Sequence, residues 1–301
     1  MTSELLDQFT DAFYGRFPLD KASLFTYSQR DLFACALGKL VVDNVRTVGL
    51  PDYSDSRYQY LTKSVTGLKE NGIFVIPGFL DKSVSAVIAE VVAGLQTGYA
   101  GHVPSLSNYT EIPVNSFEAE NAKHFCYPVS KILSLCPLLT SVITSKLLLS
   151  VATNYLGCPP TFYSINAYKS RARMGMSPGV TTPHRDYDDF RFLTCFLYLT
   201  DVDESSGAFM YWPGSHITDS IATNKPLEVV GPAGTLVLCD TWGLHMGLPP
   251  ISNDRIAIWW RFGLGKNFAY WWDKNYLLNL GNALGESLGS SILQYVFRGV
   301  L

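Results

Sequence analysis

The first part of the chain carries apolar side chains at three-to-four-residue spacing. The segments LLDQFTDAFYGRF and LFACALGKLVVDNVRTVGL both show this spacing before the turn signal at Pro51 and Asp52, and it is typical of amphipathic helices. The pattern therefore predicts an N-terminal helical extension over residues 1–66.

The period of the pattern changes after this extension. Residues 73–76 form a short β-branched run, Pro77 and Gly78 signal a turn, and Asp81 is placed to cap a helix that ends near Leu95,. The stretch from about 100 to 135 is rich in Ser, Asn, Pro and Glu without a sustained period, so it is expected to be a long loop,.

A second helix is predicted over residues 138–155, and a run of short strands separated by turns follows it. The expected strands lie within TFYSINAYKS, FRFLTCFLYLTDV, GAFMYWPGSH, LEVVGPAGTLVLCD and RIAIWWRFGLG. Short strands at roughly even spacing favour an antiparallel sandwich or jelly roll. Residues 67–264 would form this domain, and residues 265–301 would be a C-terminal helical extension packed on it.

Composition and charge then exclude several classes of protein. The chain is 47% hydrophobic and only 16% charged, which excludes disorder and coiled coil,. With a net charge of -3 and no basic stripe, nucleic acid is not an expected partner,. No apolar run reaches the roughly 18 residues of a membrane span, so no membrane partner is expected.

The six cysteines are scattered and form no Cys-x-x-Cys pair. They are expected to be small buried apolar residues, because disulfides are rare in reducing compartments. The N-terminus also lacks the layout of a signal peptide, so a cytoplasmic location is expected.

His184 and Asp186 begin the candidate chemistry. In an extended segment, residues i and i+2 project from the same face, so this imidazole and this carboxylate reach the same point. His245 follows sixty-one residues later and supplies a third ligand. Two histidines and one carboxylate form the facial set that non-haem Fe(II) uses, with the opposite coordination positions open. The alternative is that His184 and Asp186 are a surface pair.

Arg255 opens the strand RIAIWWRF ten positions after His245. A guanidinium at the start of a core strand needs an anion, and a dicarboxylate bound at the metal would supply one. Arg261 is the rival, but six strand residues separate the two by roughly 20 Å, so only one of them serves such a ligand. Arg261 is expected to face solvent or contact the C-terminal tail, while His102, His124 and His216 are expected to have structural roles in loops and turns.

The segments HRDYDDF and FLYLTDVDESSGAFMYWPGSH, with the H-x9-R spacing, resemble the phytanoyl-CoA dioxygenase family of Fe(II)- and 2-oxoglutarate-dependent oxygenases. LKENGIFVIPGFLD looks like the usual opening of that family. The resemblance covers residues 67–264, and residues 207–216 are its most specific part. It implies a double-stranded β-helix, a jelly roll with covering helices.

The resemblance also implies a ligand set and a reaction. His184, Asp186 and His245 would bind iron, and Arg255 would hold the distal carboxylate of 2-oxoglutarate. Dioxygen would complete the reactants, and 2-oxoglutarate would leave as succinate and carbon dioxide. Further cosubstrate contacts would come from Thr194 and Asn166. The family often has Ser or Thr two residues after the arginine, where this chain has Ala257, so part of the hydrogen bonding to the carboxylate must come from elsewhere.

The substrate is expected to be a small organic molecule of secondary metabolism, with Tyr187, Trp212 and Trp242 as an aromatic wall beside the iron. Related halogenases have Gly or Ala in place of Asp186, so the carboxylate favours hydroxylation, desaturation or cyclisation. A CoA or carrier-protein thioester is an open alternative, because several basic residues lie near the motif: Lys169, Arg171, Arg173, Arg185 and Arg191.

Two other classes of function stay open. One is a catalytically silent jelly-roll binding module, and the other is a cupin-type metal enzyme that does not use 2-oxoglutarate. The terminal extensions are too apolar to be free tails, since clusters such as Tyr270, Trp271 and Trp272 favour association when exposed,. They are expected to cover the jelly roll or to form a homodimer interface.

Overall fold

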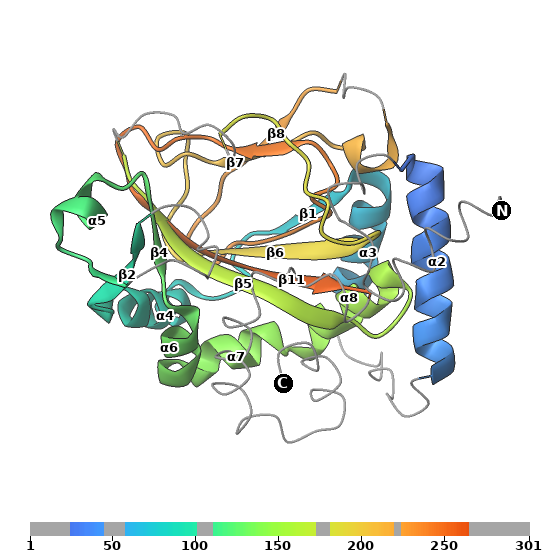
Figure 1. Ribbon diagram of the computed structural model, residues 1–301, viewed down its shortest axis with the longest axis horizontal. Coiled ribbons are helices and arrows are strands. Elements are labelled where there is room, and N and C mark those ends of the chain that lie inside the picture. The colour runs from blue at the N-terminus through green and yellow to red at the C-terminus, as the bar shows by residue number, and fades with distance from the viewer. Residues whose placement is uncertain (1–24, 45–57, 101–110, 173–180, 220–223, 265–301) are drawn as a thin grey trace.

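Two antiparallel sheets face each other in the computed structural model, which describes residues 25–44, 58–100, 111–172, 181–219 and 224–264 (Figure 1). The larger sheet has the strand order β1-β9-β6-β11-β5-β4-β2-β3, and the smaller has the order β10-β7-β8. The strands of the larger sheet are β1 (Ile73–Ile76), β2 (Thr97–Ala100), β3 (Ile112–Pro113), β4 (His124–Tyr127), β5 (Thr161–Ser170), β6 (Phe192–Tyr198), β9 (Leu236–Cys239) and β11 (Arg255–Gly263). Those of the smaller sheet are β7 (Phe209–Tyr211), β8 (Leu227–Val229) and β10 (His245–Gly247).

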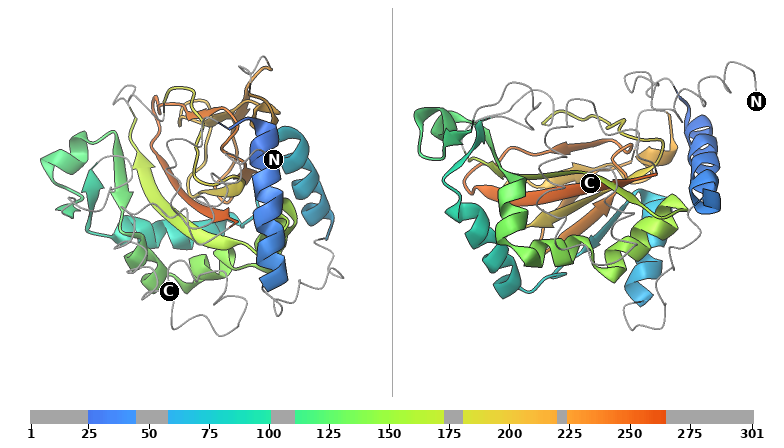
Figure 2. Two further views of the ribbon diagram at one scale, coloured as in Figure 1. Left: turned by 45° about the vertical axis from the view of Figure 1, so that its right-hand side comes forward. Right: turned by 60° about the horizontal axis from the view of Figure 1, so that its bottom comes forward.

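Helices cover the outer face of the larger sheet and one of its ends. Figure 2 shows α4, α6 and α7 across that face, while α2 and α3 stand beside each other at the end. The described helices are α2 (Tyr27–Asn44), α3 (Tyr58–Asn71), α4 (Lys82–Gly94), α5 (Phe117–Asn121), α6 (Val129–Leu135), α7 (Pro137–Ile143), α8 (Lys146–Leu156) and a 3-10 turn, η2 (Ser215–Ile217).

The alternation of side chains along β11 divides the core in two. Ile258 and Trp260 point outward into the apolar layer beneath the helices. Ala257 and Trp259 point inward into the layer between the two sheets. This is the period-2 pattern that the sequence predicts, and it places Arg255 and Arg261 on the inward face with Trp259.

The structure confirms the jelly roll and most of the strands that the sequence predicts. The short run after the extension is β1, Asp81 is the N-cap residue of α4, and β5 has the bounds of the segment TFYSINAYKS. The described helices before residue 67 are α2 and α3, and the expected boundary at 66/67 falls inside α3.

Several boundaries are wrong. The expected loop at 100–135 holds β3, α5, β4 and α6 in its described part, because elements of two to seven residues are too short to show a period,. The helix expected at 138–155 is broken into α7 and α8. LEVVGPAGTLVLCD contains two strands, β8 and β9, and β10 was not predicted. Residues 1–24 and the expected C-terminal helices at 265–301 lie outside the described residues.

In the part of the chain that the structure describes, no single helix is long and apolar enough to cross a membrane. One bent pair of helical segments is long and apolar enough when its two members are counted together. The members are Val129–Leu135 and Pro137–Leu156, and the angle between them is 103°.

Candidate metal centre

Backbone pairing brings the three predicted ligands together at the start of β10. His184 and His245 form an isolated antiparallel bridge, with N to O distances of 2.9 Å and 3.0 Å in the two directions. The amide of Asp186 donates to the carbonyl of Thr241 at 2.8 Å, so the segment 184–186 lies along the loop that leads into β10. The side chains of the two bridged histidines therefore share one face, and their ring centroids are 4.3 Å apart.

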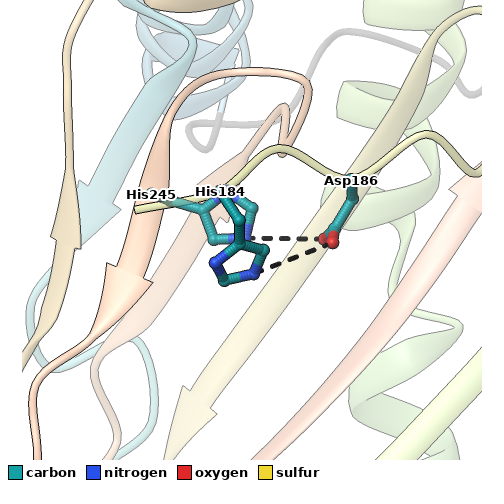
Figure 3. A group of neighbouring side chains, drawn as sticks. All are labelled: His184, Asp186 and His245. Carbon is teal, nitrogen blue, oxygen red and sulfur yellow. Dashed lines mark ion pairs between the residues drawn. The ribbon is translucent and has the colours of Figure 1, made fainter. Parts of the chain in front are cut away.

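One ligand atom from each of the three residues lies within 4.8 Å of the others (Figure 3). The Nε2 atoms of His184 and His245 are 3.9 Å and 3.5 Å from the carboxylate oxygens of Asp186. Of the three residues, His245 is fully buried, while His184 and Asp186 keep partial exposure. The sequence prediction that these residues share one point is confirmed.

The other ring nitrogens fix the tautomers of the two histidines. Nδ1 of His184 lies 2.8 Å from the carbonyl oxygen of Thr182, and Nδ1 of His245 lies 2.9 Å from that of Gly243. A carbonyl only accepts, so both Nδ1 atoms carry the proton and both Nε2 lone pairs face Asp186. Such backbone anchoring is typical of metal-binding histidines. Two imidazole nitrogens and one carboxylate are a donor set that fits Fe(II).

The surroundings of His245 and Asp186 favour the protonation states that a metal needs. Burial lowers the pKa of His245 to about 4, so its ring is neutral near pH 7,. Burial alone would raise the pKa of Asp186, but the charge of Arg261 and the two imidazoles outweigh burial and hold that pKa below its usual range. A neutral imidazole and an ionised carboxylate are the ligand forms.

Arg261 bridges two carboxylates beside the candidate metal centre. Its Nη2 lies 2.5 Å from Oδ2 of Asp186, and its Nη1 pairs with Asp188. The guanidinium also lies 4.7 Å from the ring centroid of Trp259. The expectation that Arg261 faces solvent is wrong, because the fold brings Asp186 and Asp188 to the end of β11 where this arginine lies.

Arg255 is buried without such compensation. It is 4% exposed, and its Nη2 donates only a long hydrogen bond of 3.5 Å to Oγ of Ser170. Within the described residues, no carboxylate lies at ion-pair distance from Arg255, and its Nε has no hydrogen-bond partner. Buried charges are normally paired. Arg255 is thus a fixed cation on the inward face that lacks an anion.

Thr194 and Asn166 lie on the inward faces of the strands that flank β11. Thr194 is opposite Arg261 in the register, and Asn166 is opposite Trp259. The Thr194 hydroxyl is 3.1 Å from that of Thr241, and Nδ2 of Asn166 is 3.6 Å from Sγ of Cys126. Both side chains therefore border the stretch between the two arginines, and their contact with the cosubstrate stays a prediction.

The aromatic residues near the motifs differ in their surroundings. Trp242 is buried, donates from Nε1 to the carbonyl of Asp189 at 2.6 Å, and meets the ring of Tyr187 at 4.7 Å. Trp212 is half-buried, and its amide donates to the carbonyl of Leu244 at 3.0 Å. The ring of Phe209, which sequence reasoning missed, lies 5.6 Å from that of His245. A substrate role for Tyr187, Trp212 and Trp242 stays a prediction.

Three basic residues near the motif have partners of their own. Lys169 pairs with Asp254 at 2.8 Å, and Arg191 pairs with Asp31. Arg185 donates from Nη1 to the carbonyls of Ser215 and Trp242, both at 2.6 Å. These three side chains are therefore engaged within the fold, and Arg173 lies outside the described residues.

The remaining histidines occupy separate places. His124 is on strand β4, so the expectation of a loop is wrong for it. His216 is buried in η2, where a structural role agrees with its surroundings. His102 lies outside the described residues.

Sequence reasoning also missed the roles of Asp188 and Thr241. Asp188 follows Asp186 at i+2, so the alternation used for His184 and Asp186 extends to it and is the signal that would have revealed it. Thr241 carries no such signal, because its hydrogen bond to Asp186 depends on the path of a loop.

No family model matches the chain, and no curated protein matches it. Among solved structures, it is similar to the non-haem α-ketoglutarate-dependent epimerase SnoN from nogalamycin biosynthesis, with a TM-score of 0.50 and 16% identity over 68% of this chain and 83% of that one. SnoN in complex with Fe3+, α-ketoglutarate and nogalamycin RO gives a TM-score of 0.50 and 14% identity over 68% and 84%. HygX from Streptomyces hygroscopicus, with nickel and 2-oxoglutarate bound, gives 0.47 and 14% over 67% and 86%.

The chain shares the double-stranded β-helix fold of SnoN. The similarity to SnoN confirms the fold that the sequence resemblance implies. The His-Asp-His group lies within this fold.

Proposed function

We propose that this protein is an Fe(II)- and 2-oxoglutarate-dependent oxygenase that oxidises a small organic molecule. The observation that carries the proposal is the presence, in one jelly roll, of the three-residue donor set and of a buried Arg255 that has no carboxylate partner among the described residues. The donor set suits a metal ion, and the arginine suits the carboxylate of a bound cosubstrate.

His184, Asp186 and His245 would hold the iron. Bound together, iron, 2-oxoglutarate and dioxygen supply the oxidising power, with succinate and carbon dioxide as coproducts. The residues of the chain do the positioning. Nδ1 of each histidine donates to a backbone carbonyl, which fixes the ring so that Nε2 points towards the metal position,. Arg261 holds Oδ2 of Asp186, which fixes the rotation of the carboxylate.

Arg255 would anchor the distal carboxylate of 2-oxoglutarate. Arg261 is less suited to that role because Asp186 and Asp188 already neutralise it. The apolar layer between the sheets contains Tyr198, Phe209 and Trp259, and such residues exclude water from a site,.

The first test replaces a ligand. Asp186→Ala is expected to abolish succinate formation and to reduce bound Fe(II), counted by metal analysis after anaerobic loading. Circular dichroism and the melting temperature show whether the fold persists. Succinate formation at the wild-type rate in a folded Asp186→Ala protein would contradict the assignment of this residue.

The second test separates the two arginines by titration with 2-oxoglutarate. Loss of a charge-assisted bidentate pair costs about 2 to 4 kcal/mol, or roughly thirty- to a thousandfold in affinity. Arg255→Gln is therefore expected to raise the 2-oxoglutarate requirement by this factor while iron binding changes little. Arg261→Gln is expected to leave the 2-oxoglutarate requirement near that of the wild type. The reverse result would show that Arg261 is the anchor.

Succinate also separates the alternative functions. A silent binding module would form none, and a cupin-type enzyme would act without consuming 2-oxoglutarate. The module is disfavoured because all three candidate ligands and Arg255 occur together, whereas a decayed site is expected to lose at least one. A substrate panel follows, in which the true substrate raises succinate above the uncoupled background and the product shows hydroxylation, desaturation, cyclisation or, as in the reaction named for SnoN, epimerisation.

Cytoplasmic location and a homodimer through the terminal extensions belong to the same proposal. Five of the six cysteines are buried, as expected for small apolar residues of a protein in a reducing compartment,. Sedimentation of the full chain measures its oligomeric state.

A further inference from the structure

A row of three polar side chains crosses the larger sheet at Arg255. In the strand register, Arg255 on β11 is opposite Ser170 on β5, and Ser170 is opposite His124 on β4. All three project from the face that also carries Tyr168, Cys126 and Ala257, which line the layer between the sheets. The row therefore lies at the end of the interior where Arg255 has no carboxylate partner among the described residues.

The contacts within the row are specific. Nδ1 of His124 lies 3.0 Å from Oγ of Ser170, and Nη2 of Arg255 lies 3.5 Å from the same oxygen. Ser170 is fully buried. A hydroxyl has one proton to donate and two lone pairs to accept with. Ser170 accepts from Arg255 and has capacity for two further hydrogen bonds.

We propose that Ser170 and His124 complete the carboxylate end of the cosubstrate pocket together with Arg255, which rests on the proposed function above. With Nδ1 of His124 donating, the Ser170 hydroxyl is left free to donate to the incoming carboxylate. Ser170 thus supplies the hydrogen bond that Ala257 does not provide on β11. His124 acts through Ser170 and is a positioning residue.

This arrangement also explains why the guanidinium of Arg255 is buried between the two sheets. A hydrogen bond at 3.5 Å and the ring of Tyr168 at 5.9 Å do not neutralise the charge of a buried guanidinium,. A carboxylate placed between Arg255 and Ser170 satisfies the guanidinium and the hydroxyl together. The interior thus has charge, a donor and an orienting group assembled on three neighbouring strands.

The test measures 2-oxoglutarate binding directly, by anaerobic calorimetry on the full-length protein loaded with Co(II). Ser170→Ala is expected to weaken binding about five- to twentyfold, and His124→Phe about three- to tenfold, since each removes one hydrogen bond to or through the site. His124→Asn, whose amide N–H replaces Nδ1–H, is expected to restore affinity to within about twofold. Because His124 acts through Ser170, the variant that combines Ser170→Ala with His124→Phe is expected to lose no more affinity for 2-oxoglutarate than Ser170→Ala alone.

Ser164→Ala is the matched control. This serine is on the same strand and face but opposite Arg261, whose charge is already paired. Its replacement is expected to leave 2-oxoglutarate affinity unchanged. Co(II) affinity and the rate at saturating 2-oxoglutarate are also expected to stay within about twofold for the Ser170 and His124 variants. That split between affinity and rate distinguishes a role in binding from general damage to the fold.

The outcomes separate this inference from the proposed function. Normal 2-oxoglutarate binding by Ser170→Ala and His124→Phe, with weak binding by Arg255→Gln, overturns the inference and leaves the proposed function standing. No binding of 2-oxoglutarate by the Co(II)-loaded wild type overturns both. If Ser170→Ala does not fold, Ser170→Cys, which keeps the approximate volume but weakens the donor, is measured in its place.

Discussion

Gly243 shows how tightly single residues are fixed at the candidate metal centre. A Cβ atom there would lie 1.9 Å from Oη and 2.4 Å from Cζ of Tyr211. Tyr211 is fully buried and donates to the carbonyl of Asp240 at 2.8 Å, so it has little freedom to move away. The carbonyl of Gly243 in turn anchors His245. The absence of a side chain at 243 therefore sets the position of a ligand.

Gly243→Ala is expected to lower the free energy of unfolding by about 1 to 3 kcal/mol, the usual cost of overpacking. It is also expected to weaken metal binding, because relief of the clash moves the loop that holds His245. Urea unfolding and Co(II) titration measure the two effects. Gly94→Ala is the control, since a Cβ at Gly94 meets nothing within 4 Å. Equal metal affinity in the wild type and Gly243→Ala would show that the loop tolerates the shift.

The convergence of the three candidate ligands could be predicted from the sequence, because the alternation of His184 and Asp186 is local and His245 completes a donor set that is known for non-haem iron,. The role of Arg261 could not. Its partners, Asp186 and Asp188, come from a segment more than seventy residues away, as the sequence separations of 75 and 73 show. Strand periodicity gives the face of a side chain but not which charges meet on it.

Among the elements, the segment 184–186 and the loop before β10 are tied together by Arg185. Its Nη1 donates to the carbonyl of Trp242 in that loop and to that of Ser215 in η2. The side chain thus connects the segment with two candidate ligands to the segment with the third. Charge-assisted hydrogen bonds of this kind are stronger than neutral ones.

Arg185→Met is expected to weaken metal binding about ten- to a hundredfold, the range seen when groups that orient metal ligands are lost. Competition with a chelating dye gives the affinity. Lys82→Met is the control. It removes a side chain of the same charge, whose ion pair with Asp201 is exposed and includes none of the candidate ligands, so it is expected to change metal affinity little,. If the two variants bind metal alike, Arg185 does not hold the ligand segments together.

The length of an element decides whether the sequence predicts it. The ten-residue strand β5 was predicted with its bounds, because a long run bounded by a Pro pair and by charged residues is a strong local signal,. The strands β3, β4 and β10, of two to four residues each, were not predicted. Their pairing partners, rather than their own residues, make them strands,.

At the scale of the whole molecule, α2 joins the N-terminal segment to the candidate metal centre. Phe33 packs against Phe190 with ring centroids 5.0 Å apart, and Asp31 pairs with Arg191. The guanidinium of Arg30 lies 3.6 Å from the ring centroid of Trp242, and its Nη2 donates to the carbonyl of His216 at 2.8 Å. The described helix α2 therefore packs on the jelly roll, while a dimer interface and the role of residues 265–301 stay predictions.

Arg30→Met tests whether α2 also supports the metal centre. The variant loses a buried cation–π contact and a charged hydrogen bond, so unfolding is expected to become easier by about 2 to 4 kcal/mol. Because Trp242 precedes His245 by three residues, a looser Trp242 is also expected to shift Trp fluorescence and weaken Co(II) binding. Tyr60→Ala, at an exposed site on α3, is the control for a change in a neighbouring helix. Sedimentation measures the mass of the variant in solution. A mass equal to that of the wild type shows that weaker metal binding does not come from the loss of a dimer. A destabilised Arg30→Met protein with wild-type metal affinity would show that α2 covers the jelly roll without setting the geometry of its metal centre.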